Sequence, residues 1–256
     1  MTGTLLRIFC LAAAVFYYAA FASSYLKKDS RVSFVLWMIG ISVNSGIVAN
    51  NWIVNGYMPF VSMYQVLTFL GVTYGIVYIY IRYMHNGAWM KRYIMISQAV
   101  IMTGVSFMVQ ASEWTFPPAL QSPFFIPHVF SYMISYTLVA LAAILCVISL
   151  FIADGEKKKY ENGMYNLVCT GFPFMVMGMF LGAVWANECW GNYWSWDNKE
   201  SWSLVTVLAL SVYLHFRRHE KLKKYAKWFV LLAVVFEIIT LFFVGMFGGN
   251  SMHTYN

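Results

Sequence analysis

The sequence has 256 residues, of which 61% are hydrophobic and 11% charged, and its mean hydropathy is +0.63. Soluble domains carry about a quarter charged residues, so this composition excludes an ordinary soluble protein and indicates a polytopic membrane protein. The net charge of +7 comes without an arginine-rich arm or nucleic-acid motif, and the four cysteines form no CxxC pair, so neither a nucleic-acid partner nor a disulfide framework is expected.

Eight apolar runs follow one another along the chain, each close to the length that crosses roughly 30 Å of hydrocarbon. A cleaved signal peptide is the alternative interpretation of the first run. Its cations follow the apolar residues instead of preceding them, so we expect a span. Lipid cannot satisfy backbone amides, which makes helices the expected spanning form. The sequence therefore predicts an all-α membrane protein with eight transmembrane helices in a single domain, residues 1–256. The runs cover residues 4–26, 32–53, 61–82, 94–112, 128–152, 166–187, 200–217 and 226–247.

Lysine and arginine are distributed unevenly between the two sets of alternate connections. All but Arg7 and Lys199 of the 17 cations fall in one set. By the positive-inside rule the cation-rich side is cytoplasmic. Both termini, residues 113–127 and the hydrophilic connection at 185–202 are therefore expected on the outer side.

The segment WANECWGNYWSWDNKESW, residues 185–202 and called the tryptophan segment below, holds five of the ten tryptophans. It is too polar to lie in lipid and too aromatic for an ordinary solvated loop. Indole rings favour the boundary between oil and water. We expect a layer of rings that offers apolar faces to a flat ligand such as a porphyrin, with Asp197 accepting hydrogen bonds from indole or backbone N–H groups to hold the layer. An aromatic belt, as in many membrane proteins, is the alternative.

Three histidines are candidate ligands of haem iron, because neutral imidazole is a good axial ligand. His128 follows a proline-rich outer segment, and His253 lies just outside the last span, so the two flank the tryptophan segment. His215 lies within the inner end of the seventh span, where an ionisable group is a functional candidate. The alternatives are surface hydrogen-bonding residues for the outer pair, and a headgroup-zone residue for His215. Glu237, in the middle of the eighth run, is either protonated or faces a cavity or a partner chain.

The tryptophan segment resembles the WWD signature of haem-handling proteins, in the form WGxxWxWDxKE of the CcsA/ResC branch of cytochrome c biogenesis, system II. PPALQSPFFIPHVFSYMISY and GGNSMHTY are similar to the branch's segments that carry two external haem-ligand histidines, matched here by His128 and His253. His215 stands where the family has its transmembrane haem histidine, and His219 is the alternative inner ligand. Asn198 replaces a usual proline, and Gln65 replaces a usual glutamate.

The resemblance implies a haem-handling subunit of a cytochrome c synthetase, that is, a cytochrome c haem lyase component of the bacterial cytoplasmic membrane. Haem b would be its substrate, held by axial histidine ligation, and its partners would be a CcsB/ResB-type membrane subunit and an apocytochrome c with a CxxCH motif. A haem exporter or chaperone of the CcmC kind, without ligase activity, is the first alternative, and a transporter that binds no haem is the second. The haem-binding residues carried over are His128, His253, His215, Trp185, Trp190, Trp194, Trp196, Asp197 and Trp202.

Overall fold

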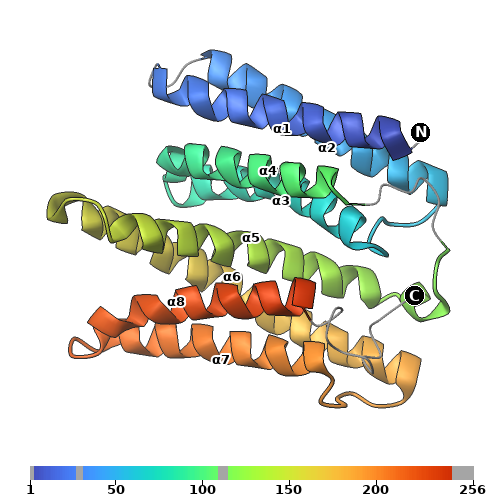
Figure 1. Cartoon of the computed structure of the whole chain (residues 1–256). Helices are drawn as coiled ribbons and strands as arrows, with labels where there is room; N and C mark the ends of the chain where they lie inside the picture. Colours follow the sequence, from blue (N-terminus) through green and yellow to red (C-terminus); the bar gives the residue numbers. More distant parts are fainter. Residues whose placement is uncertain (1–2, 27–30, 109–114, 244–256) are drawn as a thin grey trace. The chain divides into compact units, whose positions relative to one another are not determined.

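All regular elements in the described part of this computed structural model, residues 3–26, 31–108 and 115–243, are helices. Packing divides the chain into two units, residues 1–120 and residues 121–256. Figure 1 labels the main helices. In chain order the elements are α1 (Gly3–Leu26), α2 (Arg31–Asn55), α3 (Met63–Met84), η1 (Gly87–Met90), α4 (Lys91–Ser106), η2 (Pro118–Gln121), α5 (Phe125–Ser149), α6 (Asp154–Trp190), α7 (Asn198–Arg218), α8 (Lys223–Ile238) and the π-helix η3 (Ile239–Phe243).

Six of the described helices are long and apolar enough to cross a membrane: α1, α2, α3, α5, α6 and α8 with its π-helical extension. The chain is thus a polytopic helical membrane protein. α4 has 16 residues, fewer than the roughly 20 that a span needs, and α7 carries charged residues at both ends. The count of eight spans and the outer location of the termini therefore stay predictions.

In the first unit, α1 packs on α2 and α4, and α3 packs on α2 and α4. A buried glutamine joins three of these helices: Gln98 accepts a hydrogen bond from Trp37 Nε1 at 2.7 Å and donates one to the Gly71 carbonyl at 2.8 Å. The side chain of Gln65 lies at the start of α3, where its Oε1 accepts from the backbone N–H groups of Val61 and Ser62 at 3.0 and 3.3 Å. An amide oxygen fills this capping role as a carboxylate would, so the departure from glutamate preserves the helix start.

In the second unit, α5 packs on α6 and α8, and α7 packs on α6 and α8. α6 has 37 residues, about 55 Å of helix, which exceeds the roughly 30 Å of hydrocarbon. Its first turns, which the sequence analysis placed in a connection, are helical and meet the end of α7, where Arg217 pairs with Glu161 at 3.2 Å. Short segments connect the successive helices of this unit. Neighbouring helices therefore run in opposite directions (Figure 1).

The two ends of the second unit differ in chemistry. The end of α7 and the starts of α6 and α8 bring together Arg217, Glu161 and several lysines. At the opposite end, the start of α5 meets the end of α6, where the Ser122 hydroxyl donates to the carboxylate of Glu188. The tryptophan segment belongs to this second end, so within this unit it lies away from Arg217 and the lysines at the start of α8.

Candidate haem-handling site

Most of the tryptophan segment is helical. Residues 185–190 are the last turns of α6, α7 begins at Asn198, and only residues 191–197 connect them. The predicted spans 166–187 and 200–217 leave residues 188–199 as the connection, and the structure shortens it to residues 191–197. α6 continues until Gly191, whose φ of 76° lies in the left-handed region and whose N–H bonds the Asn187 carbonyl at 2.9 Å, because glycine is the residue that adopts this helix-ending conformation at least cost.

A reciprocal pair of acidic side chains shapes the connection before α7. Asp197 is the N-cap and accepts from the Lys199 N–H at 2.7 Å. Glu200 accepts from the backbone N–H groups of Ser195 and Asp197 at 2.8 and 3.1 Å. This is a capping box in which the D-x-x-E spacing satisfies donors at the helix start. The two acids of the WDxKE motif thus act first on the backbone, and they hold Trp196 in a left-handed conformation with φ of 59°.

The two residues between these acids complete the helix start. Asn198 is the first residue of α7, the position at which proline is favoured because its N–H is not needed by the helix. Replacement of the usual proline by asparagine therefore keeps the helix start, which the capping box defines. Lys199 precedes the predicted span 200–217. The pKa of its ammonium group is lowered, because the effect of burial exceeds the opposing effect of the neighbouring Asp197 carboxylate.

His128 lies in the first turn of α5, and its ring is held by α6. Its Nδ1 is 2.8 Å from the carbonyl oxygen of Gly178. Because a carbonyl can only accept, Nδ1 must carry the proton, and the lone pair of the neutral ring is then on Nε2. Metal-binding histidines are commonly oriented in this way, with one ring nitrogen donating to a carbonyl and the other directed at the metal. The position of His128 at the start of the fifth apolar run is as the sequence predicts.

Two glycines of α6 make the close approach of α5 possible. A Cβ atom at position 182 would lie 2.5 Å from His128 Cε1, and one at position 178 would lie 3.1 Å from the Tyr132 ring. Gly178 and Gly182 form a GxxxG spacing, which allows close helix packing in membranes. This spacing is readable in the sequence GMFLG.

The tryptophan rings do not lie in one plane. Trp185 is 2% exposed and packs against Phe125, His128 and Trp190, with ring centroids 5.2, 5.5 and 5.1 Å away. Trp194 and Trp196 meet edge to face at 5.8 Å, with Trp196 70% exposed.

Trp202 instead faces α8, where its ring lies 5.5 Å from that of Phe236. Because aromatic rings favour edge-to-face contacts, the five tryptophans do not form the expected flat layer. Trp185 supports His128 from within, Trp196 is accessible, and Trp202 joins α7 to α8.

The donor set in this region suits a haem. Trp194 Nε1 is buried and has no hydrogen-bond partner among the residues that the structure describes. An indole N–H can only donate, and a buried unpaired donor is costly, so a carboxylate such as a haem propionate would satisfy it. His128 Nε2 could supply a nitrogen for iron, and the aromatic rings could supply apolar faces.

His215, the predicted inner ligand, is not brought to this region. His215 is exposed in the last turn of α7, and its Nδ1 lies 2.8 Å from the Ser211 carbonyl, which again leaves the lone pair on Nε2. It is 18 residues beyond Asp197 on the same helix, about 27 Å along the axis. His253 lies outside the described residues. Across the described ranges, no group of three or more His, Cys, Asp and Glu side chains could hold a metal ion.

Comparison with known proteins assigns the family. The family model described as "Cytochrome C assembly protein" matches residues 60–250, most of the chain. The chain belongs to the cytochrome c assembly protein family. Among its relatives, the cytochrome c biogenesis protein CcsA of Trieres chinensis is 26% identical over 294 residues, covering 97% of this chain and 94% of that protein. CcsA of Guillardia theta is 29% identical, and the match covers 82% of this chain and 80% of that protein.

A shorter match is stronger in identity. CcsA of Chlamydomonas reinhardtii is 38% identical over 159 residues, which are 58% of this chain and 44% of that protein. The solved structure of the cytochrome c haem lyase CcmF has a TM-score of 0.71 and 16% identity, covering 94% of this chain and 47% of that one; this likeness shows a shared fold. The predicted CcsA-type identity is confirmed, and the chain has a role in cytochrome c maturation.

Proposed function

We propose that this chain is the haem-handling subunit of a cytochrome c synthetase, which brings haem to the outer face of the membrane and presents it to apocytochrome c. The observation that carries the proposal is the hydrogen bond from His128 Nδ1 to the Gly178 carbonyl. It leaves Nε2 as the nitrogen for iron, at the end of the unit that also holds the tryptophan segment.

The proposed outer site uses two axial ligands, His128 and His253, and two opposed imidazoles give a six-coordinate iron. Trp185 and Trp190 support the His128 ring, Trp194 offers its N–H to a propionate, and the exposed Trp196 offers an apolar face. Asp197 holds the connection that carries these rings, and Trp202 fixes the start of α7 against α8. Haem binding at these residues is the reading favoured by the buried, unpaired Trp194 N–H.

The proposed inner site uses His215, with the second ligand from a CcsB/ResB-type partner. Its Nε2 is the available ring nitrogen, and it lies at the cation-rich end of α7, which is the cytoplasmic end if the charge pattern sets the orientation. Haem would then travel about the length of α7 between the two sites. Eight spans with both termini outside, in a single domain of the bacterial cytoplasmic membrane, complete this topology.

The chemistry asked of the protein is positioning. Each thiol of a CxxCH motif adds its sulfur and its hydrogen across a haem vinyl group, so one C–S bond forms and no atom leaves. The histidine of the motif replaces one protein imidazole on the iron. His128 and the aromatic rings would hold the porphyrin so that its vinyl edge is accessible, and such orientation accounts for a large part of a catalysed addition.

The test is covalent haem on a reporter apocytochrome, made in cells that contain this chain and its membrane partner. We expect covalent haem with the native chain and strongly reduced haem with His128→Ala. Haem bound to the chain without transfer to the reporter would instead support an exporter or chaperone of the CcmC kind. A purified chain without Soret absorption, even after haem is added, would support a transporter that binds no haem and would refute the proposal.

A further inference from the structure

The second unit has a cavity at the end opposite to the tryptophan segment. It lies between α6, α7 and α8 and has a volume of about 170 Å³. A single water needs roughly 10–15 Å³ of such space, whereas drug-sized ligands occupy pockets of roughly 300–1,000 Å³. The cavity therefore suits a group the size of a phosphate with its substituents. Its polar lining residues are Glu161, Tyr213, Arg217, Lys223, Lys224 and Lys227.

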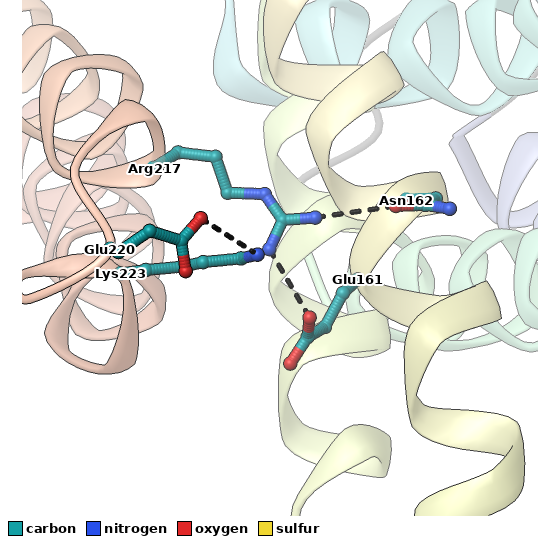
Figure 2. Close-up of polar contacts among 5 residues, drawn as sticks. All are labelled: Glu161, Asn162, Arg217, Glu220 and Lys223. Atoms are coloured by element: carbon teal, nitrogen blue, oxygen red, sulfur yellow. Dashed lines mark hydrogen bonds and ion pairs between the residues drawn. The ribbon is translucent and has the colours of Figure 1, made fainter.

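Arg217 is the fixed cation of this cavity. Figure 2 shows its side chain reaching from α7 to α6, where it bonds Glu161 at 3.2 Å and the Asn162 side-chain oxygen at 3.3 Å. Its side chain is only 15% exposed. Glu161, the one carboxylate of the lining, is thus committed to Arg217 and is less able to neutralise the lysines.

The three lysines all come from the first turns of α8. That helix has no acidic residue in its first turn, and the N-terminal end of a helix is itself positive, so the lysines repel both each other and the helix end. Lys223 has Glu220 at 3.9 Å, but the Glu220 side chain is 90% exposed, and such surface pairs contribute little. An anion between the three helices would offset this charge.

The cavity is separate from the proposed inner haem site. His215 is two residues from both Tyr213 and Arg217, the two α7 residues of the lining. Side chains two residues apart on a helix point about 200° apart, so His215 belongs to the other face of α7. The volume of the cavity is also too small for a porphyrin.

Two aromatic residues indicate the level of this cavity in the membrane. Tyr225 and Trp228 lie among the lysines of α8 and are 49% and 48% exposed. The Lys224 and Lys227 ammonium groups lie 4.8 and 5.7 Å from the centres of these two rings. Tyrosine and tryptophan mark the headgroup level of a bilayer, and basic pockets between helices at the cytoplasmic surface recognise lipid headgroups.

We propose that this cavity binds the phosphate headgroup of an anionic lipid from the cytoplasmic leaflet, with Arg217 and the α8 lysines as its cationic ligands. The lipid would join α6, α7 and α8 at their cytoplasmic ends. The inference rests on this end of the unit alone and stands whether or not the chain handles haem.

The experiment measures the thermal unfolding midpoint of the full chain, purified in neutral detergent, while phosphatidylglycerol is added. We expect the midpoint to rise with phosphatidylglycerol and not with phosphatidylcholine. Each lysine near an anionic lipid contributes about fivefold in affinity, so Lys224→Gln with Lys227→Gln should weaken the apparent affinity about 30-fold. The matched control is Lys158→Gln with Lys159→Gln, which removes two exposed cations of α6 outside the cavity and should leave the affinity within about twofold.

Three outcomes would overturn the proposal. Equal stabilisation by phosphatidylcholine would show that no headgroup charge is read. An equal loss in the control variant would assign the effect to general surface charge. Stabilisation by inorganic phosphate at the same concentration, as large as that by phosphatidylglycerol, would make the occupant a free anion and not a lipid. Arg217 is left unchanged in all variants because its bonds to α6 also support the fold.

Discussion

Gly182→Ala tests whether α6 sets the orientation of the His128 ring. The new Cβ would lie 2.5 Å from His128 Cε1 and 2.6 Å from Nδ1, whereas nonbonded carbon atoms are favourable at about 3.5–4.0 Å. The ring must therefore move by roughly 1 Å. The Nδ1 to Gly178 distance is now 2.8 Å, and such a movement takes it beyond the roughly 3.2 Å limit of a good hydrogen bond.

Loss of that hydrogen bond should lower the free energy of unfolding by about 0.5–1.5 kcal/mol. It should also weaken the affinity for iron about 10- to 100-fold, the usual effect of removing a group that orients a metal-binding histidine. The assay is the visible absorption spectrum and haem content of the purified chain with its membrane partner. The matched control is Gly155→Ala, on the same helix, where a Cβ meets nothing within 4 Å.

Fold and ligation are separated by measuring both unfolding and spectrum. Simple overpacking would lower the unfolding midpoint, yet the haem that remains bound would keep its native spectrum. The orientation argument predicts an altered spectrum per bound haem. Native haem content and a native spectrum in Gly182→Ala would refute the reasoning that the Gly178 carbonyl orients the iron ligand.

Four further substitutions test the support of the tryptophan segment through thermal unfolding of the full chain. Glu200→Ala removes half of the capping box and should destabilise by about 1 kcal/mol or more; an unchanged midpoint would contradict the role given to this carboxylate. Asn198→Pro places proline at the first position of α7 and should stabilise by about 0.4–1 kcal/mol, so a clear loss of stability would show that this position needs its N–H. Trp185→Ala should cost about 3–5 kcal/mol, whereas Trp196→Ala, at an exposed ring, should change stability by less than about 0.5 kcal/mol; equal effects would contradict the division of the rings.

Hydropathy predicts most of the spanning helices because a bilayer allows few choices. The six helices that meet the length and hydropathy requirements all fall on predicted runs. The boundaries were less predictable. α6 begins at Asp154 and not near residue 166, because a polar, lysine-rich sequence remains a good helix former outside lipid, and hydropathy does not report it.

Composition and position in the chain single out the tryptophan segment and the candidate histidines, and the resemblance adds expected roles, but their local contacts depend on the structure. The sequence analysis expects Asp197 to accept from backbone N–H groups, as it does from Lys199; the D-x-x-E spacing before an apolar run is a readable capping signal that adds Glu200 to this role. The hydrogen-bond partner of His128, in contrast, cannot be read from the local sequence. Gly178 is 50 residues away, and only the packing of α5 on the GxxxG face of α6 brings its carbonyl to the ring.

The arrangement of the tryptophans also depends on tertiary contacts. Clustering in sequence places five rings near one another, but helix direction decides which is buried. Trp185 points into the packing of α5 on α6, and Trp202 points to α8. Composition gives no sign of this division, because all five residues have the same side chain.

The most direct test of the central claim is the absorption spectrum of the haem-loaded chain, purified with its membrane partner, for the native protein and for His128→Ala. His85→Ala is the control, since that ring contacts Tyr80 in the first unit. We expect less bound haem and a changed axial-ligand spectrum for His128→Ala, with no change for His85→Ala. A native spectrum and full cytochrome c maturation in His128→Ala would contradict it.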